Sequence, residues 1–392
     1  MTRVSATRPK WDGLYDVAIV HLADARFYPL FRRQAFTLRD AGYRVALVSW
    51  ERRAGEGNPH WDGVDVYPIT IDTPSFSGRM FFARYTGALT GLLPRLRARL
   101  YQAVDPVALL PARFAASRNG SRYNYFSLEF FQGTQQLVGR PLTRRVWYGI
   151  ERLGIHRARN TAVVCRWTAE RLAALHGIAR PHVVRNVPLS AEYAAEPTGA
   201  LRRTLGVAPE VPLAVFKGDV AAGRGLVPFV KALSGVAEVH LALLGDGPLR
   251  GDIERLCQRS GLRDRVHFAG QVAPESFPAM LKEGDLGHAM HENIGDNMPL
   301  TLPSKLFDYL HAGLPVLCGN RGEMAEIVTR HRAGWCVDPD SPEMIGEALR
   351  EFLGDRGAWQ DRRTRARAAA SEYCWEREQE TYLAYVREAL GE

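Results

Sequence analysis

The sequence predicts an α/β protein made of two doubly wound parallel sheets, and three observations support this. The chain has 392 residues, which is enough for two domains of ordinary size. Short apolar runs alternate with helical patterns in both halves of the chain, as in βαβ units. Between the halves, residues 190–212 mix proline, glycine, alanine and charged residues, so we expect a linker there.

The first βαβ unit begins with the apolar run at residues 17–22, which is typical of a buried parallel strand. A helical pattern follows and stops at Gly42, a residue common at helix ends. The apolar face of this helix consists of Leu30, Phe31, Ala35, Leu38 and Ala41. Residues 43–50 then predict a second strand, and residues 64–71 predict a third.

The second half repeats this alternation of strands and helices. The predicted strands are residues 213–216, 239–244, 266–268 and 315–318. The predicted helices are residues 226–233, 249–260 and 304–312, and a last helix is predicted over residues 371–390. In open parallel sheets, ligands bind beyond the carboxyl ends of the strands. We therefore expect the ligand-binding and catalytic residues in the loops that follow strands.

Composition sets limits on the class of protein. Apolar residues make up 46% and charged residues 24%, which excludes a disordered or fibrous chain. The net charge of +8 suits an anionic partner. Five scattered cysteines argue against a disulfide framework or a cysteine zinc site and indicate a reducing cytosol. We expect neither a signal peptide nor a membrane-spanning helix, because no long apolar run exists.

The basic character is concentrated in residues 79–159, which contain 14 arginines, no lysine and three acidic residues. We expect much of this region to be helical. An apolar stripe with arginines beside it is predicted from Leu89, Leu92, Leu93, Leu96, Leu100, Arg95, Arg97 and Arg99. Such a surface would either lie on anionic lipid or be an ordinary solvated basic face. Nucleic acid is disfavoured because no binding motif accompanies the charge.

Two glycine-containing loops follow strands in the second half. Gly218 and the run Gly223-Arg224-Gly225 either cradle a phosphate at the start of the next helix or form a simple turn. The run 245–248 (Gly-Asp-Gly-Pro) either leaves an open ledge for a flat ring or forms an ordinary tight turn.

The segment 302–310 is the most informative. Pro303 and Ser304 indicate a helix start, and Lys305 lies in the first turn, where a cation opposes the helix dipole. Asp308 lies on the same face. A cation for phosphate and a carboxylate for vicinal hydroxyls describe a sugar-nucleotide site; the alternative is a solvated surface helix. Farther along, Glu323 either accepts hydrogen bonds from ligand hydroxyls or caps a local helix.

These motifs together resemble the C-terminal half of glycosyltransferase family 4. The resemblance covers about residues 213 to 340 and depends on the order of the glycine loops, the run 266–270, the run 303–316 and the run 322–328. A looser likeness covers residues 24–45 and 183–188. The resemblance implies a GT-B fold, in which two Rossmann-like domains face each other across a cleft.

The resemblance also implies the domain limits and the reaction. We expect residues 1–189 to form the acceptor-binding domain and residues 213–370 the donor-binding domain, with a C-terminal helix within 371–392 returning to the first domain. Family members transfer a sugar from a nucleotide donor with retention of configuration and without an essential metal or other cofactor. A UDP-sugar is the favoured donor and a GDP-sugar the next.

Matching positions imply roles for individual residues. Gly218, Arg224, Gly225, Ser304 and Lys305 would surround the diphosphate, with Arg224 and Lys305 assisting catalysis. The base would be framed by Gly245, Asp246, Gly247, Phe268 and Gly270. Asp308 would hold the ribose beside Leu306, and the donor sugar would lie near Asn297, Thr301 and Glu323.

Two positions depart from the family pattern. Leu300 occupies the place of the first of two glutamates that many members carry, and Asp219 stands where many have an arginine. These departures keep open the alternative of an inactive transferase-like binding protein. A second alternative is a nucleotide-sugar 2-epimerase, an isomerase that shares the two-domain architecture. The main prediction remains an enzyme of polysaccharide or glycoconjugate assembly that is cytoplasmic, either free or peripheral on the cytoplasmic membrane face.

The acceptor side is predicted in the first domain. His21 and Asp24 follow the first strand and are candidates for contact with the acceptor and for catalysis, although His21 equally suits a core histidine. Arg26 would bind an anionic acceptor or be a charge on a helix face. Glu129 lies among aromatic residues and either contacts a glycan or lipid-linked acceptor or forms a structural ion pair.

Overall fold

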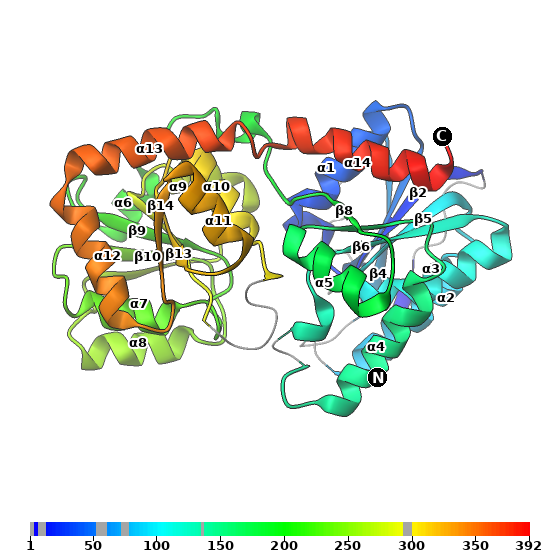
Figure 1. Ribbon diagram of the computed structural model, residues 1–392, viewed down its shortest axis with the longest axis horizontal. Coiled ribbons are helices and arrows are strands. Elements are labelled where there is room, and N and C mark those ends of the chain that lie inside the picture. Colours follow the sequence, from blue (N-terminus) through cyan, green and yellow to red (C-terminus); the bar gives the residue numbers. More distant parts are fainter. Residues whose placement is uncertain (1–3, 7–12, 52–60, 72–77, 135–136, 293–299) are drawn as a thin grey trace. The chain divides into compact units, whose positions relative to one another are not determined.

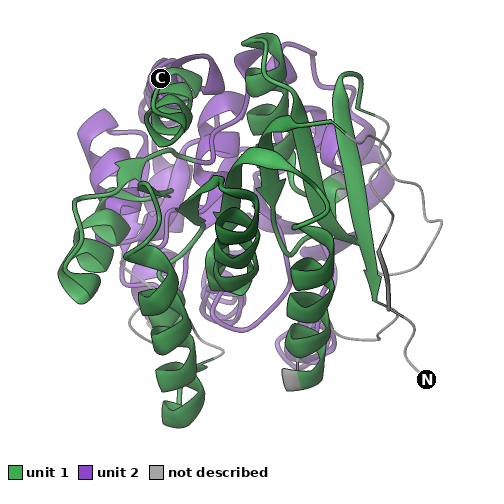
Figure 2. Ribbon diagram, turned by 90° about the vertical axis from the view of Figure 1, so that its right-hand side faces the viewer, with its two compact units in different colours: residues 1–185, 378–392 green, residues 186–377 purple. Residues whose placement is uncertain are grey.

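The computed structural model describes residues 4–6, 13–51, 61–71, 78–134, 137–292 and 300–392 (Figure 1). They form two compact units of similar size (Figure 2). Unit 1 contains residues 1–185 and 378–392, and unit 2 contains residues 186–377. Each unit has one sheet of mainly parallel strands with helices packed on it, which confirms the predicted α/β class.

The sheet of unit 1 has the order β1-β4-β3-β2-β5-β6-β7-β8, and its described strands are parallel except for β1. The strands are β1 (Val4–Ala6), β2 (Tyr15–Val20), β3 (Val45–Glu51), β4 (Val64–Ile71), β5 (Ala98–Val104), β6 (Arg122–Ser127), β7 (Thr161–Val163) and β8 (His182–Val183). The helices are α1 (Pro29–Asp40), α2 (Arg79–Leu92), α3 (Asp105–Asn119), α4 (Pro141–Ile155) and α5 (Arg166–His176). The predicted first βαβ unit is therefore present as β2, α1 and β3.

The sheet of unit 2 is parallel throughout its described strands, in the order β11-β10-β9-β12-β13-β14. Its strands are β9 (Leu213–Lys217), β10 (His240–Leu244), β11 (Val266–Gly270), β12 (Leu286–Ala289), β13 (Val316–Gly319) and β14 (Gly334–Val337). Its helices are α6 (Ala200–Leu205), α7 (Leu226–Leu233), α8 (Arg250–Arg259), α9 (Phe277–Leu281), α10 (Ser304–Ala312), α11 (Gly322–His331), α12 (Pro342–Gly354) and α13 (Arg356–Ala370).

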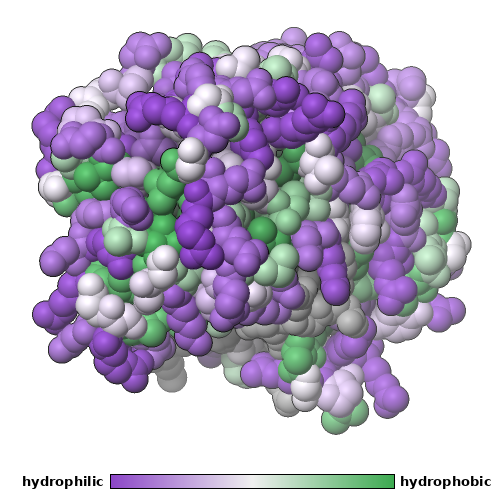
Figure 3. Space-filling model, turned by 60° about the vertical axis from the view of Figure 1, so that its left-hand side comes forward, coloured by the Kyte–Doolittle hydropathy of each residue, from purple (hydrophilic) through white to green (hydrophobic). Residues whose placement is uncertain are grey.

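Apolar side chains of each sheet are buried, and the surface is largely polar. The core of unit 2 includes Phe216 of β9, Leu241 of β10 and Leu317 of β13. On the face turned forward in Figure 3, hydrophilic residues predominate and apolar residues occur in small groups. Burial of strand side chains explains why the apolar runs at β2 and β9 were readable from the sequence.

The predicted helical stripe through residues 89–100 is wrong beyond Leu92. Helix α2 ends there, and residues 98–104 form β5 in the middle of the unit 1 sheet. From Arg95 to Leu100 exposed arginines alternate with buried apolar residues, which is the period of a strand and not of a helix. The apolar side chains of this stripe therefore belong to the core and do not form a surface for lipid.

The segment expected to be a linker, residues 190–212, is instead part of unit 2. It contains α6, whose Arg202 forms an ion pair with Asp285 at 2.7 Å and donates to the carbonyl of Glu283. These bonds join the segment to the region just before β12. Its proline and glycine content thus reflects an irregular packed segment and not a free connection.

The last helix, α14 (Trp375–Leu390), completes unit 1, to which residues 378–392 belong (Figure 2). Its buried face includes Tyr382 and Tyr385. The Tyr382 hydroxyl donates to Gln102 of β5 at 3.0 Å, and the Tyr385 hydroxyl donates to the Tyr125 carbonyl of β6 at 2.9 Å. The residues that join unit 1 begin at 378, so the preceding part of the expected returning segment, 371–377, remains in unit 2.

Truncating this contact should destabilise unit 1. We expect Tyr382→Ala to lower the free energy of unfolding by about 3–5 kcal/mol, because it empties a fully buried ring site. Tyr382→Phe should cost about 1 kcal/mol through the lost hydrogen bond. Urea unfolding followed by circular dichroism measures both, with the exposed Glu380→Ala on the same helix as control. Equal midpoints for Tyr382→Ala and Glu380→Ala would contradict this account.

Candidate functional site

In unit 2, the carboxyl ends of β9 and β10 come close together at two predicted glycines. Gly218 has φ +126° and Gly245 has φ +154°. A Cβ atom on Gly245 would lie 2.0 Å from the Gly218 carbonyl oxygen, so a side chain there cannot be accommodated. Gly225, with φ +67°, immediately precedes α7, as predicted. The two loops therefore lie together at one edge of the sheet.

Lys305 lies at this edge and is buried, with 7% of its surface exposed. Its Nζ lies 3.8 Å from the centroid of the Phe216 ring and faces Gly218. Burial is the main reason that the pKa of Lys305 lies well below its usual range, and the charge of Arg224 lowers this pKa further. Asp219 acts in the opposite direction.

Arg224 is held by a histidine that the sequence analysis did not identify. Its Nη1 lies 3.1 Å from Nε2 of His291, just after β12. Burial, and then the charge of Lys305, hold the pKa of His291 well below its usual range, so its ring is neutral near pH 7 and accepts this bond. Among the residues that the structure describes, neither Arg224 nor Lys305 forms an ion pair with a carboxylate within 4 Å.

The start of α7 already accommodates an anionic group. Oε1 of Glu292 accepts a hydrogen bond from the Gly225 amide at 3.1 Å. Burial raises the pKa of Glu292, and this amide bond acts in the opposite direction. The amide is therefore directed toward a position that an oxyanion can occupy.

Asp308 is buried, and both of its carboxylate oxygens have protein partners. The Tyr193 hydroxyl donates to Oδ1 at 2.7 Å, and Lys217 Nζ donates to Oδ2 at 2.6 Å. Lys217 is the last residue of β9, and Tyr193 lies far away in sequence. The predicted contact of Asp308 with ribose would use the remaining lone pairs of an already bonded carboxylate.

The predicted base-binding residues occur at the ends of β10 and β11. Asp246 accepts from the Gly247 amide at 2.8 Å, and a Cβ on Gly247 would lie 2.5 Å from the Val220 carbonyl oxygen. Phe268 lies under the guanidinium of Arg250 at 5.0 Å, and Gly270 ends β11. These residues follow neighbouring parallel strands, so they share one edge of the sheet with Gly218.

The other predicted donor residues follow β12 and β13. Ser304 begins α10 and Leu306 is buried on it, while Thr301 is half-buried just before this helix. Glu323 lies buried in the first turn of α11, directly after β13. Asn297 lies outside the described residues.

The predicted acceptor residues lie in unit 1. His21 follows β2, is buried and stacks on Phe31 at 3.9 Å, and neither of its ring nitrogens has a hydrogen-bond partner among the residues that the structure describes. Burial lowers its pKa to about 3, while the charge of Asp24 acts in the opposite direction. Asp24 is half-buried, and Glu129 is exposed, not half-buried as expected. Arg26 lies in the short helical turn at residues 25–27, and its side chain lies outside the described set.

The sequence analysis missed Asp105, which directly follows β5. Its φ of +56° is unusual for a non-glycine residue. Oδ1 accepts from the Leu128 amide at 2.9 Å, and burial raises the pKa of Asp105 to about 7. A polar residue after an apolar run was the available signal. It was overlooked because the region was interpreted as helical.

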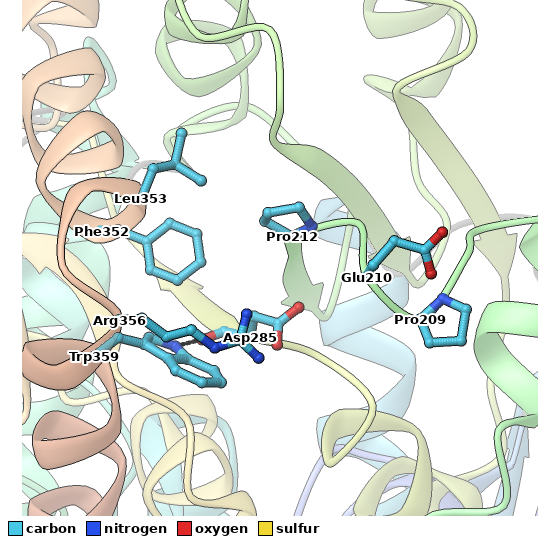
Figure 4. Close-up of a pocket in the computed structure, with 8 residues that line it drawn as sticks. All are labelled: Pro209, Glu210, Pro212, Asp285, Phe352, Leu353, Arg356 and Trp359. Carbon is cyan, nitrogen blue, oxygen red and sulfur yellow. Dashed lines mark hydrogen bonds between the residues drawn. The ribbon is translucent and has the colours of Figure 1, made fainter.

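A pocket shown in Figure 4 is not part of this site. Pro212 precedes β9 and Asp285 precedes β12, so the pocket lies at the amino ends of the strands. Trp359 donates to the carbonyl of Asp285 at 3.0 Å. The remaining lining residues are Pro209, Glu210, Phe352, Leu353 and Arg356. Within the described part of the chain, no three His, Cys, Asp or Glu side chains gather as metal ligands.

Comparison with known families finds two matches that together cover most of the chain. A model described as "Glycosyl transferase 4-like domain" matches residues 29–188. A model described as "Glycosyl transferases group 1" matches residues 212–355. The second match contains nearly all of the predicted donor residues, from Gly218 to Glu323.

Curated relatives match over part of their length. A GDP-mannose-dependent alpha-(1-6)-phosphatidylinositol monomannoside mannosyltransferase of Mycobacterium tuberculosis is 28% identical over 152 residues, which is 38% of this chain and 40% of the relative. A 2-deoxystreptamine glucosyltransferase of Streptomyces kanamyceticus is 26% identical over 218 residues, which is 53% of this chain and 54% of the relative. The chain thus spans only about 40% to 54% of the length of these two relatives.

Solved structures match over nearly the whole chain. Sucrose-phosphate synthase from Thermosynechococcus elongatus has a TM-score of 0.80 at 15% identity, covering 95% of this chain and 98% of the other. Anabaena HepE in complex with UDP-glucose has a TM-score of 0.74 at 16% identity, covering 95% and 99%. At this identity the likeness establishes the fold, which is the predicted GT-B fold of two Rossmann-like domains.

The Lys217–Asp308 pair offers a test of what holds this edge together. We expect Lys217→Met to lower the free energy of unfolding by about 2–4 kcal/mol, because it leaves a buried carboxylate without its cation. The double variant Lys217→Met/Asp308→Asn should recover most of this loss. Thermal unfolding of both, with the exposed Lys231→Met as control, measures the coupling. Additive effects of the two substitutions would contradict the pairing.

Proposed function

Because this chain belongs to glycosyltransferase family 4, we propose that it transfers a sugar from a nucleotide-diphosphate donor to a glycan, lipid-linked or small-molecule acceptor. The observation that carries the proposal is the buried Lys305 beside Arg224, two cations without a carboxylate ion pair among the described residues. A buried cation beside a half-buried one is costly unless an anion joins them. A diphosphate supplies that anion.

The cations would act on the leaving group. In transfer, the bond between the anomeric carbon and the diphosphate oxygen breaks, and negative charge develops on the nucleoside diphosphate. Lys305 and Arg224 would stabilise this charge from fixed positions. The Gly225 amide would add a donor where the diphosphate displaces the Glu292 carboxylate from it. Ser304, at the start of α10, would contribute its hydroxyl.

We further propose that the reaction retains configuration and uses no metal ion. The acceptor oxygen forms the new bond to the anomeric carbon, and its proton passes to the departing phosphate oxygen. No protein base is then required for this step. His21, whose pKa of about 3 keeps the ring neutral, would accept a hydrogen bond from an acceptor hydroxyl or donate one to it. Asp24, Arg26 and Glu129 would be the further contacts with the acceptor.

A UDP-sugar is the donor that we propose first, and a GDP-sugar second. Anabaena HepE was solved with UDP and glucose and with UDP-glucose, while the mycobacterial relative is named for GDP-mannose. The base would lie over Gly245–Gly247 and Phe268. Asp308 would receive the ribose hydroxyls beside its bonds to Tyr193 and Lys217.

Nucleotide binding is the first test. UDP at 100 times its dissociation constant should stabilise the chain by about 2.7 kcal/mol. We expect the stabilisation to disappear in Lys305→Ala and in Arg224→Ala and to persist in Lys231→Ala, which replaces an exposed lysine of α7. Thermal unfolding with UDP, GDP and their sugars measures this and identifies the base. A shift that survives Lys305→Ala would contradict the site.

Turnover separates the proposed reaction from its alternatives. Incubation of the matching nucleotide sugar with an acceptor panel should release the nucleoside diphosphate and yield a glycoside. Conversion of the nucleotide sugar without any acceptor would indicate the epimerase. Binding without any turnover would indicate the inactive binding protein, to which Leu300 in place of a glutamate points.

Binding should also be coupled to proton uptake. The pKa of Lys305 lies below its usual range in the unliganded chain, and a bound diphosphate raises it again. The affinity for UDP should therefore fall as the pH rises from the pKa of Lys305 in the unliganded chain to its higher pKa in the complex, by up to about tenfold per pH unit. Lys305→Arg keeps its charge throughout and should flatten this dependence. Calorimetric titration from acid to alkaline pH in paired buffers measures it, and Lys231→Arg is the control. An unchanged pH dependence in Lys305→Arg would contradict this assignment.

A further inference from the structure

Helix α4 of unit 1 has two faces of very different character. On its inner face, Trp147 lies edge-on to Phe131 at 5.1 Å, and Glu151 is buried and accepts from Tyr125 at 2.8 Å. A Cβ on Gly154 would lie 2.9 Å from Leu109 Cβ, so the helix lies directly against α3. The side chains on this inner face pack against other parts of unit 1.

The outer face carries an exposed apolar stripe. Leu142 is 75% exposed, Val146 61% and Leu153 59%. Spacings of four and seven residues place the three side chains along one line of the helix. Apolar side chains of this size, repeated on one line and open to solvent, form a patch and not scattered exposure. We name this set, Leu142, Val146 and Leu153, the outer stripe.

Arginines line the outer stripe without acidic partners. Arg145 and Arg152 each precede a stripe residue and are exposed. Neither forms an ion pair with any residue that the structure describes; Arg152 donates to the Tyr148 hydroxyl at 3.3 Å. The single acid of α4, Glu151, is buried on the opposite side.

On two helices of unit 2, arginines form ion pairs with acidic residues of the same helix. On α8, Arg250 pairs with Glu254 at 2.9 Å and Arg255 with Asp252. On α13, Arg365 pairs with Asp361 at 2.7 Å. What distinguishes α4 is that its exposed arginines lie beside an exposed apolar line.

We propose that the outer stripe of α4 docks on the surface of an anionic lipid bilayer. The apolar side chains would enter the boundary between headgroups and acyl chains, and the arginines would extend to the lipid phosphates. Among the described residues, no helix is long and apolar enough to cross a bilayer, so the contact is with a surface. This inference goes beyond the proposed transfer reaction and does not depend on it.

The charge pattern disfavours other occupants of the outer stripe. A second copy of this chain would bring the same arginines together across a two-fold contact, with like-charge repulsion. A nucleic acid would pair with the arginines but would leave the apolar line uncovered by any complementary surface. An anionic bilayer would bury the apolar side chains and pair with the arginines at the same time.

Vesicle sedimentation of the full chain tests the proposal. We expect binding to vesicles containing phosphatidylglycerol, weaker binding to pure phosphatidylcholine, and release by salt. Leu142→Ser/Val146→Ser/Leu153→Ser should weaken binding at least roughly tenfold. Arg145→Gln and Arg152→Gln should each weaken it about fivefold. Because these side chains are exposed, the thermal unfolding midpoint and the nucleotide-induced shift of unit 2 should stay unchanged.

Matched controls come from unit 2. Met344 on α12 is 41% exposed, and Arg259 on α8 is exposed; Met344→Ser and Arg259→Gln should bind vesicles like the parent. The proposal would be overturned if the triple α4 variant bound anionic vesicles as well as the parent does. It would also be overturned if the parent did not bind anionic vesicles. A parent dimer that the triple variant converts to a monomer without loss of vesicle binding would assign the outer stripe to self-association instead. Loss of nucleotide binding alone would bear on the transfer reaction and not on this surface.

Discussion

The donor edge of unit 2 depends on one constraint, which is the lysine buried in the first turn of α10 without a carboxylate ion pair among the described residues. The Phe216 ring faces the Lys305 ammonium group, while burial lowers the pKa of Lys305 well below its usual range. Arg224, held by His291, increases the cost of a second charge. The same arrangement that weakens the unliganded state favours a dianionic ligand, since binding energy then relieves an existing repulsion.

Much of this edge was readable from the sequence because its parts are local. Gly218, Gly225 and Gly245 all have positive φ and lie next to the end of a strand or the start of a helix, and Lys305 lies at a recognisable helix start. Their partners were not readable. Tyr193 lies 115 positions from Asp308, and Lys217 lies 91 positions away. Only the folded chain brings such residues together.

The error in unit 1 has a similar physical origin. Arginines between Leu96 and Leu100 suggested an amphipathic helix, whereas burial at every second residue produces β5. Once β5 is assigned to the core, the apolar side chains exposed beside arginines are those of α4. Glu151 on the inner side and the outer stripe on the other make α4 both a structural support and a surface, with little overlap between the two roles.

The division of the chain into units also has a consequence for its biosynthesis. Unit 1 needs residues 378–392, which the ribosome adds only after all of unit 2 has been made. In the nascent chain, α14 therefore does not yet cover the part of the unit 1 sheet that contains Gln102 and Tyr125 while unit 2 is being made. Translation order and folding order are thus decoupled, and the synthesis of residues 378–392, rather than the emergence of residue 185, sets the moment at which unit 1 can become native.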